Sequence, residues 1–337
     1  MNVMKKIRIG QLGIGHNHGA MRMKALRGLS DYFEVVGVAE DDPAWLEKRR
    51  DRPSYAGLPM MSEAELLAVP GLEAVMIETV GPQLLEAAQR CADRGLHLCM
   101  DKPGGEDLAG FRKLCDTVES RNLAFQMGYV YRTNPALRFC FEAAKDGWLG
   151  DIFEIHAVMS RDDSENEPYR QWMGKFKGGA MYIFAGYLID VVLKLLGAPD
   201  RVTPFLRQTR GDGVVDNGLA VLEYPRATAT VRVSIVEVEG YDYRRVIVCG
   251  TKGSFELSPI EYRAVETPLK IRLTLKEPCG EYAAGTHTVD CGPMGNRYQT
   301  QEIEFARVVR GEIANPYPVE YEYLLQKTLL EASGFKF

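Results

Sequence analysis

The sequence lacks an excess of positive charge, a pair of closely spaced cysteines and a long uncharged apolar run. Lys and Arg number 41 against 46 Asp and Glu, a net charge of −5, which argues against nucleic acid as the main partner. The seven cysteines are scattered and contain no CxxC pair, so reduced thiols are favoured over disulfides or a zinc site. No run reaches the roughly 18 apolar residues of a membrane span, and the first residues do not form a secretory signal. We therefore expect a cytoplasmic protein without a membrane partner.

The chain of 337 residues is longer than one hydrophobic core usually supports, so we expect two domains. Its first third alternates short β-branched runs with helical patterns, which is typical of βαβ units and a doubly wound parallel sheet. The expected strands are Ile7–Leu12, Phe33–Ala39, Ala74–Glu78, Leu96–Met100 and Ala124–Val130.

Beyond Tyr131 the pattern changes to alternating, turn-bounded segments that indicate a mostly antiparallel sheet. One long helix, Gly179–Leu196, interrupts them, and helices at about Tyr298–Arg310 and Val319–Ala332 close the chain. The expected strands of this part are Ile152–Ser160, Arg201–Thr209, Leu219–Tyr224, Thr228–Glu237, Tyr243–Cys249, Gly253–Leu257 and Ile271–Lys276. The fold class is therefore α/β, with a division at residues 128 and 129; the C-terminal helix is a candidate to pack back on the first domain.

A glycine-rich turn joins the first strand to the first helix, in the context of a dinucleotide-binding fingerprint. It comprises Gly13, Ile14, Gly15, His16, Asn17 and His18. The two glycines permit the tight turn and the approach of a diphosphate to backbone amides. His18 replaces the third glycine of the fingerprint, and the alternative is a merely tight βα turn.

Glu40 ends the second strand, at the spacing where a carboxylate meets the adenosine ribose. Asp41 and Asp42 follow without an adjacent arginine, so a 2′-phosphate would face three carboxylates. NAD is therefore favoured over NADP, although Asp41 and Asp42 also fit a solvated acidic turn. His16 and His18 form an HxH pair, but the motif supplies no third ligand, so we expect no metal.

Lys102 follows the strand Leu96–Met100 and Asp101, and it precedes Pro103. Because a residue before proline is driven out of the helical region, we expect Lys102 to be extended at the carboxyl end of the strand, where ligands of α/β sheets bind. A lysine beside a positive nicotinamide ring is a candidate acid/base for a substrate hydroxyl. The alternative is a surface lysine at a loop entry.

At this point the sequence resembles the Gfo/Idh/MocA family of NAD(P)-dependent sugar and polyol oxidoreductases. The resemblance covers nearly the whole chain: LGIG after the first strand, DKP where the family usually has EKP, YVYRTNPALR, GGAMYIFAGYLID, DNGLAVLEYP and GTKGSFEL. It implies a Rossmann domain over residues 1–128, in which Thr79, Asp101 and Lys102 join the glycine-rich turn at the cofactor. It also implies a substrate-binding α/β domain over residues 129–337, whose open sheet makes a homodimer or homotetramer.

The sequence departs from the family pattern where the long helix begins. The family's Asp and, four residues later, its His correspond to Ile183 and Tyr187. Isoleucine cannot accept a proton, whereas Tyr187 can relay one if a cation such as Lys102 lowers its pKa; the alternative is that Tyr187 only packs. The expected substrate contacts are Tyr131, Arg170, Trp172, Tyr182 and Asp190, each with packing or solvation as its alternative.

Three functions fit these features. The leading hypothesis is an NAD-dependent dehydrogenase or reductase acting on a sugar, cyclitol or related hydroxy or keto compound, with Lys102 and Tyr187 as the catalytic residues. A second is a lyase, epimerase or glycosidase that keeps NAD bound and oxidises its substrate transiently. A third is a non-catalytic NAD-binding sensor, motivated by Ile183 and by Leu84, which lies in a segment where the family's usual Asn and His are absent, but opposed by the retention of Lys102.

Overall fold

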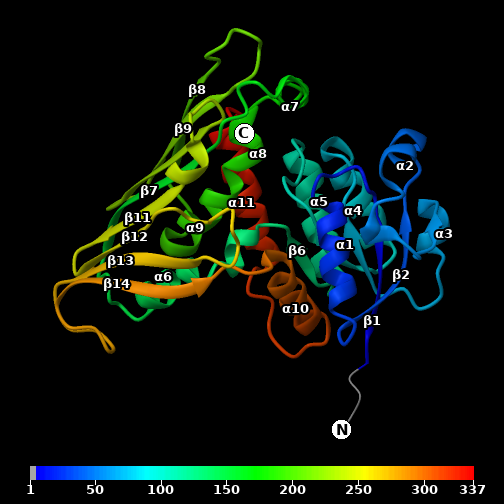
Figure 1. The fold of residues 1–337 in the computed structure, drawn as a ribbon, viewed down its shortest axis with the longest axis horizontal. Helices are drawn as coiled ribbons and strands as arrows, with labels where there is room; N and C mark the ends of the chain where they lie inside the picture. Colours follow the sequence, from blue (N-terminus) through cyan, green and yellow to red (C-terminus); the bar gives the residue numbers. More distant parts are fainter. Residues whose placement is uncertain (1–4) are drawn as a thin grey trace. The chain divides into compact units, whose positions relative to one another are not determined.

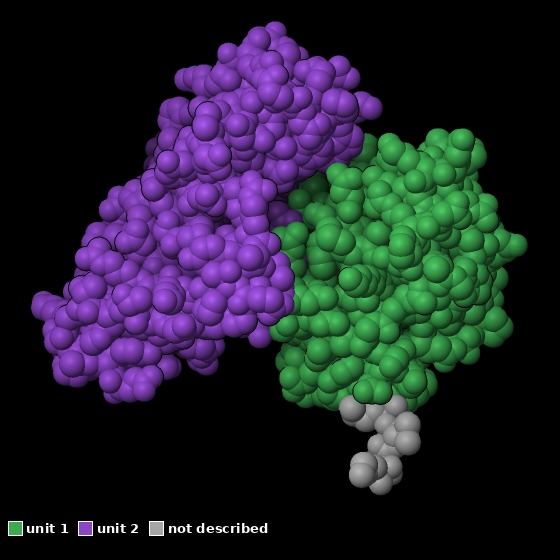
Figure 2. Space-filling view, in the orientation of Figure 1, with its two compact units in different colours: residues 1–129, 296–323 green, residues 130–295, 324–337 purple. Residues whose placement is uncertain are grey.

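The computed structural model describes residues 5–337 and divides into two compact units. Unit 1 comprises the chain up to Tyr129 together with Asn296–Tyr323, and unit 2 comprises Val130–Gly295 together with Leu324–Phe337 (Figure 2). Within residues 5–337, no helix combines the length and the hydropathy that a bilayer crossing requires.

Unit 1 is built on a six-stranded parallel sheet in the order β3-β2-β1-β4-β5-β6 (Figure 1). Its strands are β1 (Ile7–Leu12), β2 (Phe33–Ala39), β3 (Met60–Met61), β4 (Ala74–Ile77), β5 (His97–Met100) and β6 (Phe125–Met127). In the register, Leu12 lies opposite Ile77, and Ile77 lies opposite Met100. Because parallel strands end at the same edge, the residues that follow β1, β4 and β5 are brought side by side. The predicted doubly wound sheet is confirmed.

The helices of unit 1 are α1 (Gly19–Gly28), α2 (Pro43–Arg49), α3 (Glu63–Leu67), α4 (Leu84–Asp93), α5 (Leu108–Ser120) and α10 (Arg297–Val309). Three of them, α2, α3 and α10, begin at a residue whose side chain caps them. Ser62 and Glu65 form a complete capping box at α3, and the Asp42 carboxylate caps α2. These side chains satisfy amides that have no partner within their own helix.

Helix α10 packs with unit 1 although it follows the second sheet in the sequence. Phe305 and Ala306 are buried in the same apolar cluster as Ile7, Leu26 and Phe33. The single division expected between residues 128 and 129 places α10 in the second domain. The structure groups α10 with unit 1 instead, because its apolar residues complete the core of that unit.

Unit 2 is built on an eight-stranded sheet in the order β14-β13-β12-β11-β7-β10-β9-β8. Only β10 and β7 pair in parallel; all other neighbours are antiparallel. The strands are β7 (Ile152–Ser160), β8 (Arg201–Arg207), β9 (Asn217–Glu223), β10 (Thr228–Ser234), β11 (Arg245–Gly250), β12 (Gly253–Leu257), β13 (Pro268–Leu275) and β14 (Gly285–Pro293). The helices are α6 (Pro135–Lys145), α7 (Glu167–Met173), α8 (Ala180–Phe184), α9 (Gly186–Leu196) and α11 (Val319–Ala332), the last of which begins in unit 1.

Three elements of unit 2 differ from the sequence-based prediction. The long helix expected over Gly179–Leu196 is interrupted at Ala185, next to Gly186, a residue that weakens helices. Helix α7 forms in a segment predicted to be a polar loop, with a proline in its first turn. Strand β14 was not predicted because it is an edge strand with little apolar character, paired with β13 alone.

Candidate active site

The glycine-rich turn after β1 has a backbone that only glycine fits at its first position. Gly13 has φ +90°, and a Cβ built on it would lie 2.4 Å from the Thr79 backbone nitrogen. A Cβ on Gly15 would lie 2.7 Å from Val80 Cγ1. The Gly13 amide donates to the Ala39 carbonyl at 2.7 Å, which ties the turn to the end of β2. The turn is therefore closely packed on the loops after β2 and β4.

Arg49 fixes the rest of this turn, a role that the sequence did not reveal. Its Nη1 donates to the carbonyls of Ile14, Gly15 and His16 at 2.9, 2.9 and 2.7 Å, and its Nη2 donates to Asn17 Oδ1 at 3.0 Å. Since the C=O and N–H of a trans peptide point in opposite directions, the amides of Gly15 and Asn17 face away from Arg49. A basic residue in the last turn of the helix after β2 is the only signal that a sequence offers for such a contact.

Glu40 braces the same turn through its carboxylate. Its Oε2 accepts the Ile14 amide at 2.9 Å and its Oε1 accepts the Asp42 amide at 3.0 Å. The two following acids have local backbone roles as well: Asp41 accepts the Glu63 amide at 3.1 Å, and Asp42 accepts the Ala44 amide at 2.9 Å. All three carboxylates thus lie at the carboxyl end of β2.

A cluster of imidazoles and carboxylates forms where β1, β4 and β5 end. His16 Nδ1 and His18 Nδ1 each lie 2.9 Å from Asp101 Oδ2, and Glu78 Oε2 lies 3.6 Å from His16 Nδ1. The side chains of Asp101 and Glu78 are fully buried, whereas those of His16 and His18 are 10% and 20% exposed. The HxH motif therefore meets two acids that are distant in the sequence.

Burial dominates the protonation of this cluster. It lowers the pKa of His18 to about 4 despite the neighbouring Asp101, so this imidazole is neutral at pH 7. Burial and then the charge of Asp101 raise the pKa of Glu78 well above its usual value. Burial also opposes ionisation of Asp101, yet contact with the two histidines brings its pKa below its usual range.

Arg22 of α1 is a fully buried cation in contact with this cluster. Its Nε lies 3.1 Å from Glu78 Oε1, and its Nη2 donates to Cys99 Sγ at 2.7 Å. Glu302 of α10 is also fully buried, and burial raises its pKa to about 8 against the opposing charge of Arg22. Glu302 therefore keeps its proton near neutral pH.

Lys102 and Thr79 lie at the same sheet edge, one position beyond Asp101 and Glu78. Asp101 Oδ1 accepts the Lys102 amide at 2.7 Å, the Lys102–Pro103 peptide is cis, and the Lys102 residue is 5% exposed. Thr79 is partly buried and follows β4 directly. Unit 1 thus brings together the predicted cofactor contacts, including Gly13, Ile14, Gly15, His16, Asn17, His18, Glu40, Thr79, Asp101 and Lys102.

In unit 2, Tyr187 and Ile183 occupy successive turns of α8 and α9 and are buried. The Tyr187 ring lies 5.2 Å from the Tyr131 ring, whose hydroxyl donates to Glu261 Oε1 at 2.8 Å. Burial and then the Glu261 charge raise the pKa of Tyr131, so Tyr131 stays a neutral phenol that supports Tyr187.

Two of the expected substrate contacts are engaged in buried ion pairs. Arg170 Nη2 lies 2.6 Å from Asp212 Oδ2 and 3.1 Å from Asp216 Oδ2. Asp190 is paired with Arg132 at 2.9 Å, and both side chains are almost fully buried. These charges are balanced within unit 2, which disfavours direct binding of a substrate by either Arg170 or Asp190.

Two other expected contacts, Trp172 and Tyr182, belong to an aromatic row. Trp172 stacks on Tyr169 with a centroid separation of 5.4 Å and an interplanar angle of 5°. Phe176 joins Trp172 to Tyr182 at centroid distances of 5.1 and 5.3 Å. Tyr182 is buried, so only the Trp172 end of the row is accessible.

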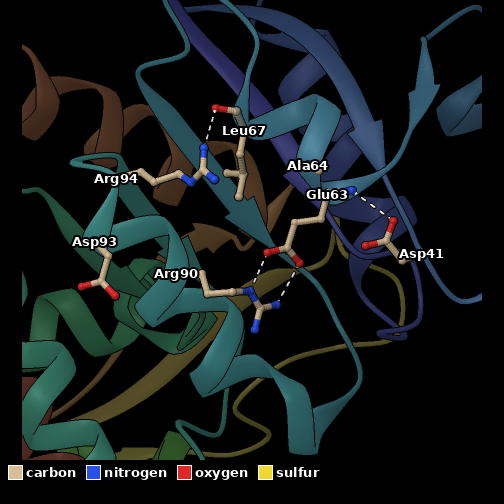
Figure 3. A pocket seen from close by; sticks show the side chains of 7 residues that line it. All are labelled: Asp41, Glu63, Ala64, Leu67, Arg90, Asp93 and Arg94. Carbon is tan, nitrogen blue, oxygen red and sulfur yellow. Dashed lines mark hydrogen bonds and ion pairs between the residues drawn. The ribbon is translucent and has the colours of Figure 1, made fainter.

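A surface hollow of unit 1 is bordered by Asp41, which follows β2 (Figure 3). It is lined by Asp41, Glu63, Ala64, Leu67, Arg90, Asp93 and Arg94. Arg90 donates two hydrogen bonds to the Glu63 carboxylate, from Nε to Oε1 at 2.5 Å and from Nη2 to Oε2 at 2.8 Å. Arg94 Nη1 donates to the Leu67 carbonyl at 3.5 Å. Arg90 is thus neutralised by Glu63, whereas the contact of Arg94 is to a backbone carbonyl.

Comparison with known proteins identifies both halves of the chain. Residues 7–129 match the oxidoreductase family with an NAD-binding Rossmann fold, and residues 139–256 match the GFO/IDH/MocA C-terminal domain. An uncharacterized oxidoreductase of Escherichia coli, YhhX, is 29% identical over 231 residues, which are 67% of this chain and 64% of that protein. The match therefore spans just under two thirds of this relative's length.

Relatives with named substrates are more distant. The D-xylose 1-dehydrogenase (NADP(+)) 2 of Haloferax volcanii is 27% identical over 69% of this chain and 73% of its own. The scyllo-inositol 2-dehydrogenase (NAD(+)) of Bacillus subtilis is 24% identical over 60% of this chain and 59% of its own.

Among solved structures, the WlbA dehydrogenase of Bordetella pertussis, in complex with NADH and UDP-GlcNAcA, has the same fold with a TM-score of 0.82. It is 17% identical and the match covers 99% of this chain and 97% of that one. The glycine turn, its acidic partner and the two matched domains lead to one conclusion: the chain belongs to the Gfo/Idh/MocA family of NAD(P)-dependent oxidoreductases.

Proposed function

We propose that the protein is an NAD-dependent dehydrogenase or reductase that transfers a hydride between nicotinamide and a sugar, cyclitol or related hydroxy or keto compound. The observation that carries the proposal is the placement of Lys102 at the same sheet edge as the glycine turn, Glu40 and Thr79. A nicotinamide dinucleotide bound along that edge supplies the hydride chemistry. The named relatives act on D-xylose and scyllo-inositol, which is consistent with a polyhydroxylated substrate.

Lys102 is assigned the proton of the reacting hydroxyl, with Tyr187 as its partner. Ile183 has no proton to exchange, so the acid/base work falls to these two residues. A phenolate on Tyr187 requires a cation to lower its pKa from about 10, so Tyr187 stands as the second catalytic candidate after Lys102. Of the expected aromatic contacts, the partly exposed Trp172 is the one assigned to the C–H faces of a ring, since Tyr131 and Tyr182 are buried.

The coenzyme assigned is NAD because a 2′-phosphate would approach three carboxylates, Glu40, Asp41 and Asp42. A pair of like charges about 4 Å apart in water repels by about 1 kcal/mol, and the 2′-phosphate would meet three such carboxylates. We therefore expect NADPH to bind at least tenfold more weakly than NADH. Fluorescence titration of both cofactors measures this ratio. Equal or tighter binding of NADPH would overturn the assignment.

The test of the catalytic assignment is Lys102→Met with Lys113→Met, an exposed lysine on α5, as its control. Removal of a general acid/base is expected to lower kcat by about 10²-fold or more, while NADH binding stays within a few-fold of wild type. Turnover of the true substrate, found by screening sugars and cyclitols, is followed through NADH absorbance. If Lys102→Met turns over as fast as Lys113→Met, the lysine is not the acid/base.

A second candidate function follows from Ile183, which stands where the family has an aspartate. An enzyme that retains NAD and oxidises its substrate only transiently would perform an elimination or an epimerisation. Product formed without net NADH, with slow release of the cofactor, would favour this function over a dehydrogenase.

A further inference from the structure

The imidazole and carboxylate cluster at the end of β1, β4 and β5 has an unusual composition for a cofactor loop. It comprises His16, His18, Glu78 and Asp101. Within residues 5–337, ligand atoms of His16, His18 and Asp101 all lie within 4.8 Å of one another. Glu78 Oε2 adds a fourth atom, 3.6 Å from His16 Nδ1. Ligands about 2 Å from a tetrahedral ion lie roughly 3.3 Å apart, so the 2.9 Å contacts to Asp101 and the 3.6 Å contact to Glu78 are near that spacing, and the widest separation must contract by about 1 Å when an ion binds.

The two imidazoles converge on one carboxylate oxygen. His16 Nδ1 and His18 Nδ1 each lie 2.9 Å from Asp101 Oδ2, within hydrogen-bond distance. His16 Nδ1 also lies 3.4 Å from the His18 amide nitrogen. A metal ion bound here would take the place of the protons that the two imidazoles share with Asp101.

Glu78 provides a second observation. Its side chain is fully buried, and among the described residues no N–H group donates to either carboxylate oxygen in hydrogen-bond geometry. Arg22 Nε lies 3.1 Å from Oε1, and Oε2 lies 3.6 Å from His16 Nδ1. Glu78 also lies within hydrogen-bonding reach of Asp101. Two buried carboxyl groups this close repel each other unless a proton or a cation lies between them, and a dication is complementary to both.

We propose that His16, His18, Asp101 and Glu78 bind one divalent transition-metal ion of the zinc class. Two imidazole nitrogens with carboxylate oxygens suit Zn²⁺, Co²⁺ or Mn²⁺ better than the all-oxygen sites of Ca²⁺ and Mg²⁺. The exposed edges of the two histidines, at 10% and 20%, give the ion a path from solvent. Both histidine Nδ1 atoms point inward, so the bound ion would brace the glycine turn from beneath.

The experiment uses the full chain, freed of metal with a chelator and titrated with ZnCl₂ by calorimetry in the absence of any nucleotide. The expected result is one Zn²⁺ per chain. His16→Gln, His18→Gln and Asp101→Asn are each expected to weaken Zn²⁺ at least tenfold. The matched control is His156→Gln, since His156 pairs with Glu154 at 3.0 Å but is 41% exposed and lacks further ligands; it is expected to leave the affinity unchanged.

X-ray absorption of the zinc-loaded wild type reads the ligands directly and does not depend on the variants folding. It is expected to show imidazole and oxygen ligands without a Zn–S distance of about 2.3 Å. Absence of stoichiometric binding, sulfur ligation, or full affinity in both histidine variants would each overturn the proposal. Because no coenzyme or substrate is present, these outcomes are separate from the fate of the proposed dehydrogenase activity.

Discussion

Glu302→Gln is expected to make the stability of unit 1 less sensitive to a rise in pH between about 4.5 and 8. Glu302 is fully buried on α10, and burial raises its pKa to about 8. In the unfolded chain a glutamate ionises near pH 4.5. The folded protein therefore holds a proton that the unfolded chain has lost between these two values, and its stability falls as the pH rises through that window.

The magnitude follows from the linkage between protonation and folding. Each pH unit inside the window costs about 1.4 kcal/mol, so at pH 7 the wild type has lost about 3 kcal/mol of stability through this one group, as an upper bound. Glutamine keeps the shape of the protonated carboxyl and has no proton to lose. The free energy of unfolding of Glu302→Gln, relative to wild type, is expected to rise with pH from 5 to 8 and to level off above about 8.

The assay is urea unfolding at pH 5, 6, 7 and 8, followed through the fluorescence of Trp45, the only tryptophan of unit 1. Trp148 and Trp172, which belong to unit 2, are replaced by phenylalanine in every protein. Glu119→Gln, at an exposed position of α5, is the control and should run parallel to the reference protein. If Glu302→Gln also runs parallel across this range, Glu302 is ionised in the folded protein and the reasoning from its burial is wrong.

Three further substitutions test other features of the structure. Gly13→Ala is expected to destabilise unit 1 by at least about 2 kcal/mol, because φ is +90° and the new Cβ would lie 2.4 Å from the Thr79 nitrogen; Gly57→Ala, with φ +76° and no atom within 4 Å, should cost less in the same urea assay. Arg49→Met removes the guanidinium that fixes the glycine turn, so NADH binding should weaken about tenfold in a fluorescence titration, whereas the exposed Arg50→Met should not change it. Arg170→Met leaves the buried Asp216 without its ion-pair partner and is expected to lower the stability of unit 2 by about 3 kcal/mol, measured by thermal unfolding. The control is Arg201→Met, which breaks an exposed ion pair with Glu223 and is expected to cost less than about 1 kcal/mol.

The sequence predicted the sheet of unit 1 well because its strands are buried, β-branched and separated by capped helices. The strands Ile7–Leu12 and Phe33–Ala39 are found as predicted. The elements that it did not predict have weak local signals. Strand β14 is polar and stabilised only by pairing with β13, and α7 depends on a short cap and on contacts made after folding.

The sequence predicts those site residues that carry a local motif at the end of a single strand. It does not predict contacts between residues that follow different strands. The glycine turn and Glu40 carry local signals, and the structure brings them together through the Ile14 amide. The meeting of His16 and His18 with Glu78 and Asp101 depends on the order β1-β4-β5, which no local spacing reveals. Arg170 and Asp190 were expected to meet a substrate because buried ion pairs and exposed charges look alike in a sequence.

The return of residues 296–323 to unit 1 has a consequence for protein engineering. A fragment that stops at Tyr129 would keep every strand of the parallel sheet but would leave Ile7, Leu26 and Phe33 without the Phe305 and Ala306 side chains that cover them. An exchange of coenzyme modules with a relative must therefore transplant two separate stretches of chain at once. Recombination at a single crossover would yield hybrids prone to aggregate through the uncovered patch.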